Sequence, residues 1–491
     1  MTLFNENHFV AASRCPRAVY LLTHAAPATS FAVMDPDEHR RVLRLAAPLM
    51  PGPVVTIQGE PEDRLHQTRQ GLKAHQAMLG ATLAHEGWMA EVDYLGPHPR
   101  GGWQMLAVVP EQSVAKPLLR WLAYQAHIVQ AAGVELVEVG VFTLNPGYCR
   151  GQRLEPARLF QLQTVTSAVA HASREMAEGL GRFAAAASRL APDPESAAAS
   201  SALPLGPHCE DGGDCPFKPR CWREHLPEHN VFHLYQLNRA KAFKLYQEGW
   251  AALHLLPRSL RTPRREAQLY AIQTRRPYVD RPALRQFLAR LEYPLHCLDF
   301  ETVSAAVPWM PGLQSFNLIP VQFSLTHVKA PNAAPEHETF LLAGQSDPRL
   351  PILDRLKAGL GRRGSILAYN APFEQMVLGG LVRGQPAEES WYQSLAPRWV
   401  DLLEPFKNFY CYYAGQKGSC SLKDVLPAVT GKGYEDLAIQ DGQQATRAWL
   451  RLIFDRLPDE ESARLRLELK AYCRRDTEAL VWLVQALQAL V

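Results

Sequence analysis

The sequence has no long hydrophobic run, and its charge is nearly balanced. None of its uninterrupted apolar stretches reaches membrane-spanning length. The N-terminus lacks a basic start followed by an apolar segment, so we expect no secretory signal peptide. The formal net charge of +3 neither requires nor excludes nucleic acid, because a basic groove can lie within a nearly neutral total. These absences favour a cytoplasmic protein without a membrane partner.

The cysteines do not form the even, closely spaced set that indicates a disulfide framework. There are nine of them, an odd number, and no secretion signal precedes them. Three stand in the segment PHCEDGGDCPFKPRCW, at Cys209, Cys215 and Cys221, with five residues between each and the next. Glycines and prolines keep this loop, residues 207–223, irregular, so the thiolates can converge, and Cys15 is the best candidate for a fourth ligand. Zinc and an iron–sulfur cluster both accept four cysteine thiolates.

The chain is long enough for two to four domains, each with its own core. In the first part, residues 117–133 have the pattern of an amphipathic helix and residues 134–144 that of a strand. Residues 183–207 are rich in Ala, Ser and Pro and predict a linker or an exposed excursion of the chain, and residues 230–292 have a mostly helical pattern. Strands alternating with helices then predict an α/β domain that ends in a long helix; they are expected at about 295–301, 320–328, 338–342 and 365–369, and the helix at about 459–490.

Acidic residues stand inside this second, apolar pattern. In YPLHCLDFET, Asp299 and Glu301 are two apart on a predicted strand, so both point to the same face. Glu374 comes early in the helix that follows the strand ending at Asn370. Asp476 lies in the last helix, four residues after a tyrosine and on the same face. Buried together, these acids would need cations; the other interpretation is a set of unrelated, solvated surface acids.

In order and context, D-x-E, N-x-x-F-E and Y-x-x-x-D resemble the tyrosine-type DEDD exonucleases, which have an RNase H-like fold with a mixed sheet flanked by helices. The resemblance implies two Mg²⁺ or Mn²⁺ ions about 3.5–4 Å apart, with carboxylates as their ligands. The superfamily usually has Asp where this chain has Glu374, and Asp401 is a nearby spare acid that we rank below it. The implied metal ligands are Asp299, Glu301, Glu374 and Asp476. The resemblance also implies that Tyr472 orients the attacking water.

The cysteine arrangement resembles the RecB-like nucleases with an iron–sulfur staple, of which Cas4 is the best-known member. The resemblance implies a [4Fe–4S] cluster on Cys15, Cys209, Cys215 and Cys221, with zinc as the alternative, although the C-x5-C-x5-C spacing departs from the commoner C-x2-C-x5-C.

It also implies a PD-(D/E)xK nuclease site in the first domain. Asp93 takes the first acidic position, but Ala107, Val108 and Val109 stand where Glu-Val-Lys is expected. Tyr124-Gln125 and NPGYCR at 145–150 still resemble the later helix and strand. We therefore expect a degenerate, inactive nuclease fold, in which His66 is either a remnant of the site or an ordinary histidine.

The chain also resembles a family of bacterial proteins labelled DUF2779. The shared features lie mainly in residues 205–490: the cysteine loop, LDFET, PVQFSLT, YN-x-x-FE, GSCSLKDVLP, a DG-x-x-A turn and YC-x-x-DT. The label carries no activity and implies only a two-part build. The expected parts are a Cas4/RecB-like domain at 1–229, a helical connector at 230–292 and an RNase H-like domain at 293–491.

These patterns predict a metal-dependent 3′–5′ exonuclease acting on DNA or RNA, with a single-stranded end as the expected partner. The polarity follows from the resemblance alone. A rival is a catalytically silent iron–sulfur protein that binds nucleic acid or a partner, and a third reading is endonucleolytic cutting that depends on Asp93. Asn370, Ser419 and Lys423 are possible nucleic-acid contacts, with helix capping the alternative for the serine. A basic run, Arg258, Arg261, Arg264 and Arg265, either lines the path of the strand or forms a solvated helix face.

Overall fold

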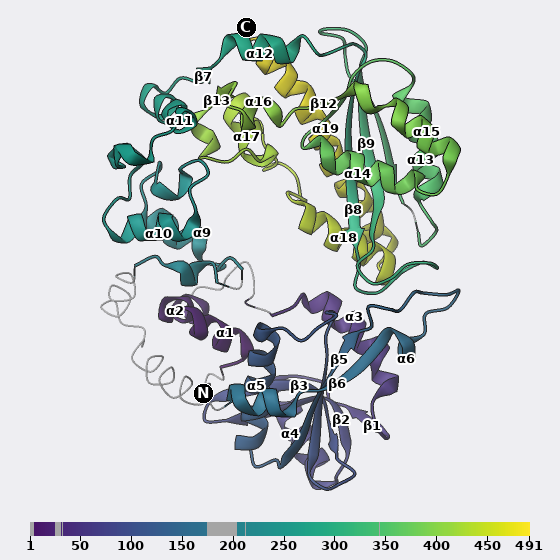
Figure 1. Cartoon of the computed structure of the whole chain (residues 1–491). Coiled ribbons are helices and arrows are strands. Elements are labelled where there is room, and N and C mark those ends of the chain that lie inside the picture. Colours follow the sequence, from purple (N-terminus) through teal and green to yellow (C-terminus); the bar gives the residue numbers. More distant parts are fainter. Residues whose placement is uncertain (1–3, 25–30, 32, 174–203, 212, 343) are drawn as a thin grey trace. The chain divides into compact units, whose positions relative to one another are not determined.

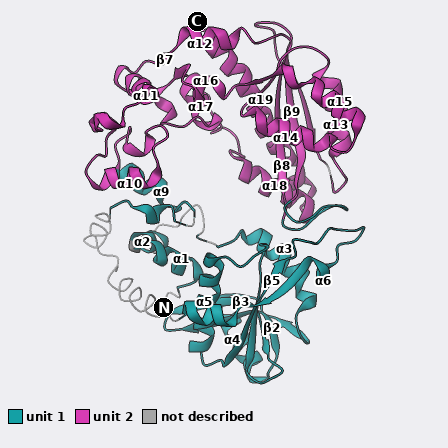
Figure 2. Cartoon of the chain, in the orientation of Figure 1, with its two compact units in different colours: residues 1–225, 306–316 teal, residues 226–305, 317–491 magenta. Residues whose placement is uncertain are grey.

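Helices and strands alternate through the chain in a mixed α/β arrangement (Figure 1). The computed structural model describes residues 4–24, 31, 33–173, 204–211, 213–342 and 344–491, so most of the predicted linker at 183–207 lies outside the described residues. Two compact units divide the chain (Figure 2): unit 1 is Met1–His225 with Ala306–Phe316, and unit 2 is Leu226–Ala305 with Asn317–Val491. The expected connector, residues 230–292, therefore falls within unit 2.

Unit 1 is built on a mixed sheet whose described strands follow one another in chain order. β1 pairs with β2 and β4 with β5 in parallel, and the other neighbours are antiparallel. α5 (Lys116–Ala131) packs against the sheet, and both it and β5 occur where the sequence predicts them. The strands are β1 (Val54–Thr56), β2 (Ala77–His85), β3 (Trp88–Pro97), β4 (Trp103–Val108), β5 (Leu136–Leu144) and β6 (Phe160–Thr164).

Residues 306–316, which come between two strands of unit 2 in the sequence, belong to unit 1. Ala306 and Val307 are buried in a core cluster with side chains of the unit 1 sheet. The Arg150 backbone N–H donates to the carbonyl of Leu313 at 2.9 Å, and the Arg150 guanidinium donates to the carbonyl of Pro308 at 2.8 Å. The remaining unit 1 helices are α1 (Glu6–Arg14), α2 (Pro16–His24), α3 (Pro36–Ala46), α4 (Pro61–Lys73), α6 (Pro156–Leu159) and α9 (Lys218–His225).

Unit 2 contains a mixed sheet in the order β10-β9-β8-β11-β12, counted over the described residues. β8 pairs antiparallel with β9 and parallel with β11, so it lies in the middle of the sheet. All four strands predicted from the sequence are present, together with the long final helix α19 (Asp459–Gln488). The strands are β8 (Leu295–Ser304), β9 (Leu318–Val328), β10 (Glu336–Leu341), β11 (Ile366–Ala368) and β12 (Trp399–Asp401).

The two faces of β8 pack against different helices. Leu298 and Phe300 join a core with residues of α13 (Arg349–Leu360) and α14 (Ala371–Val382). Leu295 and Cys297 join a second core with residues of α19. Since side chains alternate along a strand, Asp299 and Glu301 continue the α19 side, and the ladder shifts register only after Glu301.

The remaining helices of unit 2 surround this sheet and the segment before it. α11 contacts both strands of a small two-stranded sheet, β7 (Tyr278–Val279) and β13 (Cys411–Tyr412). α17 (Leu422–Thr430) and α18 (Gly442–Phe454) both contact α19. The others are α10 (Arg239–Gln247), α11 (Pro263–Thr274), α12 (Arg281–Leu288), α15 (Pro386–Ser394) and α16 (Glu404–Lys407).

Candidate functional site

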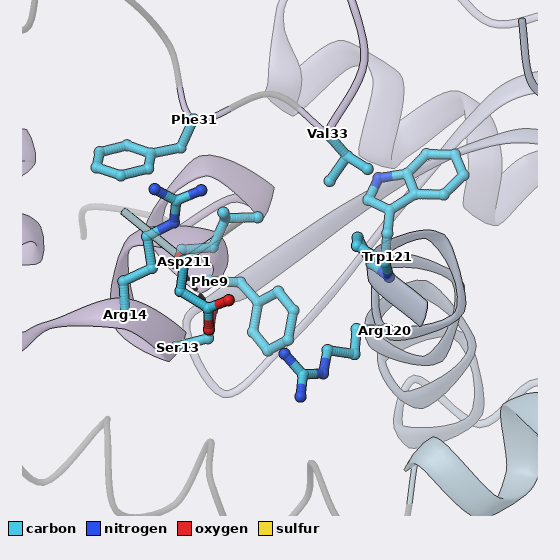
Figure 3. A pocket seen from close by; sticks show the side chains of 10 residues that line it. Phe9, Ser13, Arg14, Phe31, Val33, Arg120, Trp121 and Asp211 are labelled. Carbon is cyan, nitrogen blue, oxygen red and sulfur yellow. Dashed lines mark hydrogen bonds between the residues drawn. The ribbon is translucent and has the colours of Figure 1, made fainter. Parts of the chain in front are cut away.

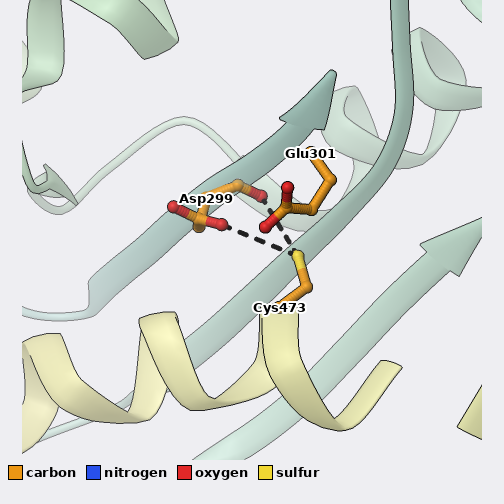
Figure 4. A group of neighbouring side chains, drawn as sticks. All are labelled: Asp299, Glu301 and Cys473. Atoms are coloured by element: carbon orange, nitrogen blue, oxygen red, sulfur yellow. Dashed lines mark hydrogen bonds between the residues drawn. The ribbon is translucent and has the colours of Figure 1, made fainter. Parts of the chain in front are cut away.

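Two carboxylates and a thiol meet where β8 faces α19. Asp299 and Glu301 on the strand and Cys473 on the helix point toward one another (Figure 4). Their ligand atoms all lie within 4.8 Å of each other, and no other group of three His, Cys, Asp or Glu side chains in the described part of the chain meets that condition. Cys473 Sγ lies 3.7 Å from Asp299 Oδ2, within reach of an S–H donor. The thiol therefore orients one carboxylate, while the carboxylate oxygens suit a hard cation better than sulfur does.

Glu374 brings a third carboxylate from a different element. It stands in the first turn of α14, directly after β11, and is 4% exposed. The Phe300 backbone of β8 hydrogen-bonds its carboxylate. The other oxygen, Oε2, is buried and has no hydrogen-bond partner among the described residues. A buried carboxylate oxygen without a partner is costly, so this atom is suited to receive a cation.

α19 adds Asp476 and Tyr472, which lie one turn apart on its buried face. The hydroxyl of Tyr434, from the loop after α17, donates a hydrogen bond to Asp476 Oδ1. Lys423 of α17 places its ammonium 5.4 Å from the Tyr472 ring centroid and 5.7 Å from that of Tyr434. The two aromatic rings and the lysine thus border the carboxylates.

Burial raises the pKa of all four acids, and repulsion by neighbouring acids adds to this increase for Asp299, Glu301 and Glu374. Burial has the largest effect on Asp299 and raises its pKa well above the usual range. The charges of Asp476, Glu374 and Glu301 raise it further, in decreasing order of effect. Burial and then Glu301 raise the pKa of Glu374 in the same way. Burial and Asp476 raise the pKa of Glu301 to about 8 although Lys423 opposes this, and burial raises that of Asp476 to about 6 against the Tyr434 hydrogen bond.

The donor set fits divalent cations. Four carboxylates from three elements are held together in a half-buried to buried setting, and one of their oxygens has no partner in the described chain. Hard cations such as Mg²⁺ and Mn²⁺ prefer carboxylate oxygens, and two of them would compensate four negative charges. Asp299, Glu301, Glu374 and Asp476 are the residues that would hold them.

Asp401, the spare acid, makes backbone contacts instead. Its Oδ1 accepts from the N–H of Asn370 at 2.8 Å and from that of Leu403 at 3.0 Å. These bonds hold Asn370, which has a left-handed backbone (φ 68°), at the start of α14. The structure therefore sets Glu374 among the other carboxylates, and Asp401 supports the turn in front of it.

The other predicted nucleic-acid contacts have mixed positions. Ser419 accepts a hydrogen bond from the Ser421 N–H, and Ser421 caps α17, so both serines serve the local backbone. Arg265 donates to three backbone carbonyls, those of Tyr235, Leu260 and Gln236, which assigns its guanidinium to the fold. Arg264 stays exposed and reaches Asn408 at 3.3 Å.

In unit 1, the four predicted cysteines gather near one another. Cys15 lies between α1 and α2, and its charge acts on the pKa of each of the other three thiols, Cys209, Cys215 and Cys221. None of the four forms a disulfide. The Cys215 N–H donates to the carbonyl of Cys209 at 3.0 Å, which folds the loop back on itself.

A hydrogen bond and an ion pair connect the cysteine segment to the N-terminal helices. Arg14 donates to the carbonyl of Gly213 at 2.8 Å, and Arg17 pairs with Glu224 of α9. Within the described residues, the four thiols do not form a group whose sulfur atoms all lie within 4.8 Å of one another.

The nuclease-like position in unit 1 lacks an open carboxylate. Asp93 on β3 is buried, accepts from the Val108 N–H at 2.8 Å and lies 3.1 Å from His39 of α3. Ala107 and Val109 are buried in the core. His66 is exposed on α4, and its Nε2 lies 2.8 Å from the side-chain amide nitrogen of Gln70. His39, which the sequence analysis did not single out, is the histidine beside Asp93.

A small pocket of about 170 Å³ lies between α1, α5 and the cysteine loop (Figure 3). Phe9, Trp121, Arg14, Arg120 and Asp211 line it. Its volume is below that of common small-molecule sites, which start near about 300 Å³.

Tyr434 and Cys473 were also missed by the sequence analysis. Tyr434 stands in a loop with no catalytic motif around it, so nothing in the sequence ties it to Asp476. Cys473 is part of the YC-x-x-DT pattern, and its position next to Tyr472 on the buried face of α19 was the available signal.

Comparison with known proteins adds a family but no activity. A curated protein of Mycoplasma pneumoniae (strain ATCC 29342 / M129 / Subtype 1), named as an uncharacterized homolog of MG366, is 26% identical over 203 residues. The match covers 37% of this chain and 30% of that relative. No solved structure gives a significant match. Among the described helices, none is both long and apolar enough to cross a membrane. Residues 296–421 match the family described as "Domain of unknown function (DUF2779)".

Proposed function

We propose that this chain is a metal-dependent 3′–5′ exonuclease that hydrolyses phosphodiester bonds of DNA or RNA, and that unit 2 carries the reaction. The observation that supports this most is the convergence of Asp299, Glu301, Glu374 and Asp476, with an unpartnered buried oxygen on Glu374. The sheet order and its flanking helices agree with the proposed RNase H-like domain.

The four carboxylates would hold two Mg²⁺ or Mn²⁺ ions, which supply charge compensation and Lewis acidity for phosphoryl transfer. Tyr472 orients the attacking water with its hydroxyl. Burial and the adjacent acids raise the pKa of that hydroxyl, so it remains protonated and can serve as a donor. Tyr434 holds Asp476 in place. The positive charge of Lys423 lowers the pKa of Glu301 and of Asp476 against the effect of burial, and the same charge would attract a phosphate.

Unit 1 takes the role of a degenerate, RecB-like domain that binds nucleic acid without cutting it. Cys15, Cys209, Cys215 and Cys221 would hold a [4Fe–4S] cluster that ties the N-terminal helices to α9. Asp93 is engaged by His39 and a backbone N–H, which argues against cutting by this unit.

A nuclease assay with end-labelled single strands and Mn²⁺ tests the proposal. Wild type should shorten a 5′-labelled strand stepwise, and Asp299→Asn should reduce the rate by at least about a thousandfold, because one of the carboxylates proposed to hold the cations is lost. Glu336→Gln, an exposed acid on β10, is the matched control and should cut like wild type.

Three outcomes would contradict the proposal. If wild type binds strands without shortening them, the silent scaffold is the better description. If cutting survives Asp299→Asn and is lost in Asp93→Asn, the reaction belongs to unit 1. If the 5′-labelled strand is first cut at internal positions rather than shortened stepwise, the enzyme is an endonuclease.

A further inference from the structure

A cavity of unit 2 is lined by residues close in sequence to the carboxylate site, but none of the four carboxylates lines it. It is an open pocket of about 500 Å³, within the range of small-ligand sites. Its lining includes Tyr235, Tyr369, Asn370, Lys407, Ser421 and Leu422.

Two helices carry both this pocket and the carboxylate site. Asn370 precedes α14 and lines the pocket, while Glu374, one turn later, faces the acids. Ser421 and Leu422 begin α17 and line the pocket, while the next residue, Lys423, reaches toward Tyr472. The pocket is therefore within about one helical turn of the reacting centre on both elements.

The pocket combines aromatic surface with positive charge. The Tyr369 hydroxyl donates to the carbonyl of Cys420 at 2.7 Å, and the Tyr235 hydroxyl donates to the carbonyl of Lys407 at 3.1 Å, so both rings are fixed in place. The Lys407 side chain is exposed. Arg264 and Lys407 both lie close enough to the Cys420 thiol to lower its pKa, against the dominant effect of burial.

We propose that this pocket binds one nucleotide of a single-stranded nucleic acid, next to the nucleotide whose phosphate lies at the carboxylates. The base packs on Tyr369 and Leu422, and Lys407 and Arg264 contact the backbone phosphate. Stacking on aromatic rings combined with cations along the backbone is the general mode of binding single strands. The inference rests on the proposed function for the position of the scissile phosphate, but not for binding itself.

The test is equilibrium binding in the full-length Asp299→Asn protein, so that no cleavage is needed. The probes are fluorescein-labelled single strands of DNA and of RNA, about ten nucleotides long, titrated at several salt concentrations. Lys407→Gln and Arg264→Gln should each weaken binding about three- to tenfold and reduce the salt slope by about 0.7 per lost phosphate contact. Arg362→Gln is the matched control and should bind like the parent protein. Arg362 is exposed and precedes the start of β11, whereas the pocket residues Tyr369 and Asn370 follow its end.

A second pair of variants tests the stacking surface. Tyr369→Phe keeps the ring and should retain binding, whereas Tyr369→Leu should weaken it about tenfold. Weakening with both nucleic acids, or with only one of them, supports the pocket and identifies its occupant. If Lys407→Gln and Arg264→Gln bind both single strands as Arg362→Gln does, or weaken only duplex binding, the inference is overturned. An inactive wild type with weakened binding in these variants would instead refute the exonuclease and leave the subsite standing.

Discussion

At the scale of single residues, the carboxylate group is a source of instability unless cations are bound. The other three acids raise the pKa of Asp299, and Asp476 also raises the pKa of Glu301 and of Glu374, so these negative charges disfavour one another. Buried like charges are retained in folded proteins when a function needs them, since burial without compensation costs stability.

Removing one of these charges should therefore stabilise the metal-free protein. In EDTA, Asp299→Asn should raise the Tm of unit 2 by a few degrees, about 1 kcal/mol, because an amide replaces a repelled carboxylate. Adding Mn²⁺ should raise the Tm of wild type but leave the variant nearly unchanged. Differential scanning calorimetry measures both; an equal Mn²⁺ shift in the two proteins would mean that the cation binds elsewhere.

Tyr434→Phe should weaken cation binding without unfolding the protein. The variant keeps the ring beside Lys423 and deletes only the donor to Asp476. We expect an approximately tenfold rise in the Mn²⁺ concentration for half-maximal effect, equivalent to about 1.4 kcal/mol, measured by isothermal titration calorimetry. An unchanged titration would show that Asp476 is positioned by α19 alone.

Much of this centre can be predicted from the sequence, for an identifiable reason. Asp299 and Glu301 interrupt an apolar strand at a spacing of two, and Tyr472 and Asp476 share a helix face, so local periodicity alone orients them. Tyr434 has no such periodicity, because its loop reaches Asp476 only through tertiary packing. Likewise, Arg265 looks identical to its exposed neighbours in the sequence, although it is bound by backbone carbonyls.

At the scale of elements, β8 carries a histidine that burial keeps neutral. His296 lies opposite His327 of β9 with their Nδ1 atoms 3.0 Å apart, and its Nε2 lies 3.0 Å from the carbonyl of Arg363. Burial, opposed by that backbone contact, lowers the pKa of His296 to about 4 from 6.5. The stability of the β8–β9 pair, in which β8 carries Asp299 and Glu301, is therefore expected to depend on pH.

The pH dependence has a defined sign. Between about pH 4 and 6.5 the unfolded chain binds more protons at His296 than the folded one, so its stabilising contribution is complete above pH 6.5 and is lost as the pH falls. In urea titrations, the unfolding free energy of wild type minus that of His296→Gln should decrease as the pH is lowered from about 6.5 to about 4. His254→Gln, at an exposed position, is the control; a flat difference would mean that His296 charges freely in the fold.

α19 is fixed to the sheet by a buried hydroxyl network. Thr477 Oγ1 lies 2.9 Å from Ser324 Oγ and 2.8 Å from Thr326 Oγ1, and all three residues are fully buried. Thr477→Val should leave the two β9 hydroxyls short of a partner and destabilise unit 2 by about 1–3 kcal/mol. Chemical denaturation measures this, with Thr274→Val, at an exposed position at the end of α11, as the control. A loss no larger than that of the control would mean that packing alone docks the helix.

At the scale of the whole molecule, the two units should respond separately to loss of their metals. Anaerobically purified protein should be brown and contain iron and sulfide, whereas colourless protein with zinc would overturn the cluster assignment. Cys215→Ser should lose the visible absorption and lower the unfolding temperature of unit 1 by several degrees. Cys149→Ser, an exposed cysteine outside the group, should leave both unchanged.

The domain plan was harder to predict than the site, because sequence order and packing disagree. Segment 306–316 comes shortly after β8, and its sequence pattern does not indicate that Ala306 and Val307 pack in a core with unit 1 side chains. The connector at 230–292 likewise joins unit 2 through long-range bonds, such as that from the Asp280 N–H to the carbonyl of Tyr410 at 2.8 Å.

That short segment has a consequence for inheritance and for engineering. A gene fragment ending at His225 would encode a first half without the peptide that completes its interior, and a fragment starting at Leu226 would carry that peptide with nothing to cover it. The two halves therefore cannot be exchanged between relatives as independent cassettes. Recombination that swaps one must keep eleven residues of the other in register, Ala306–Phe316, which ties their evolution together.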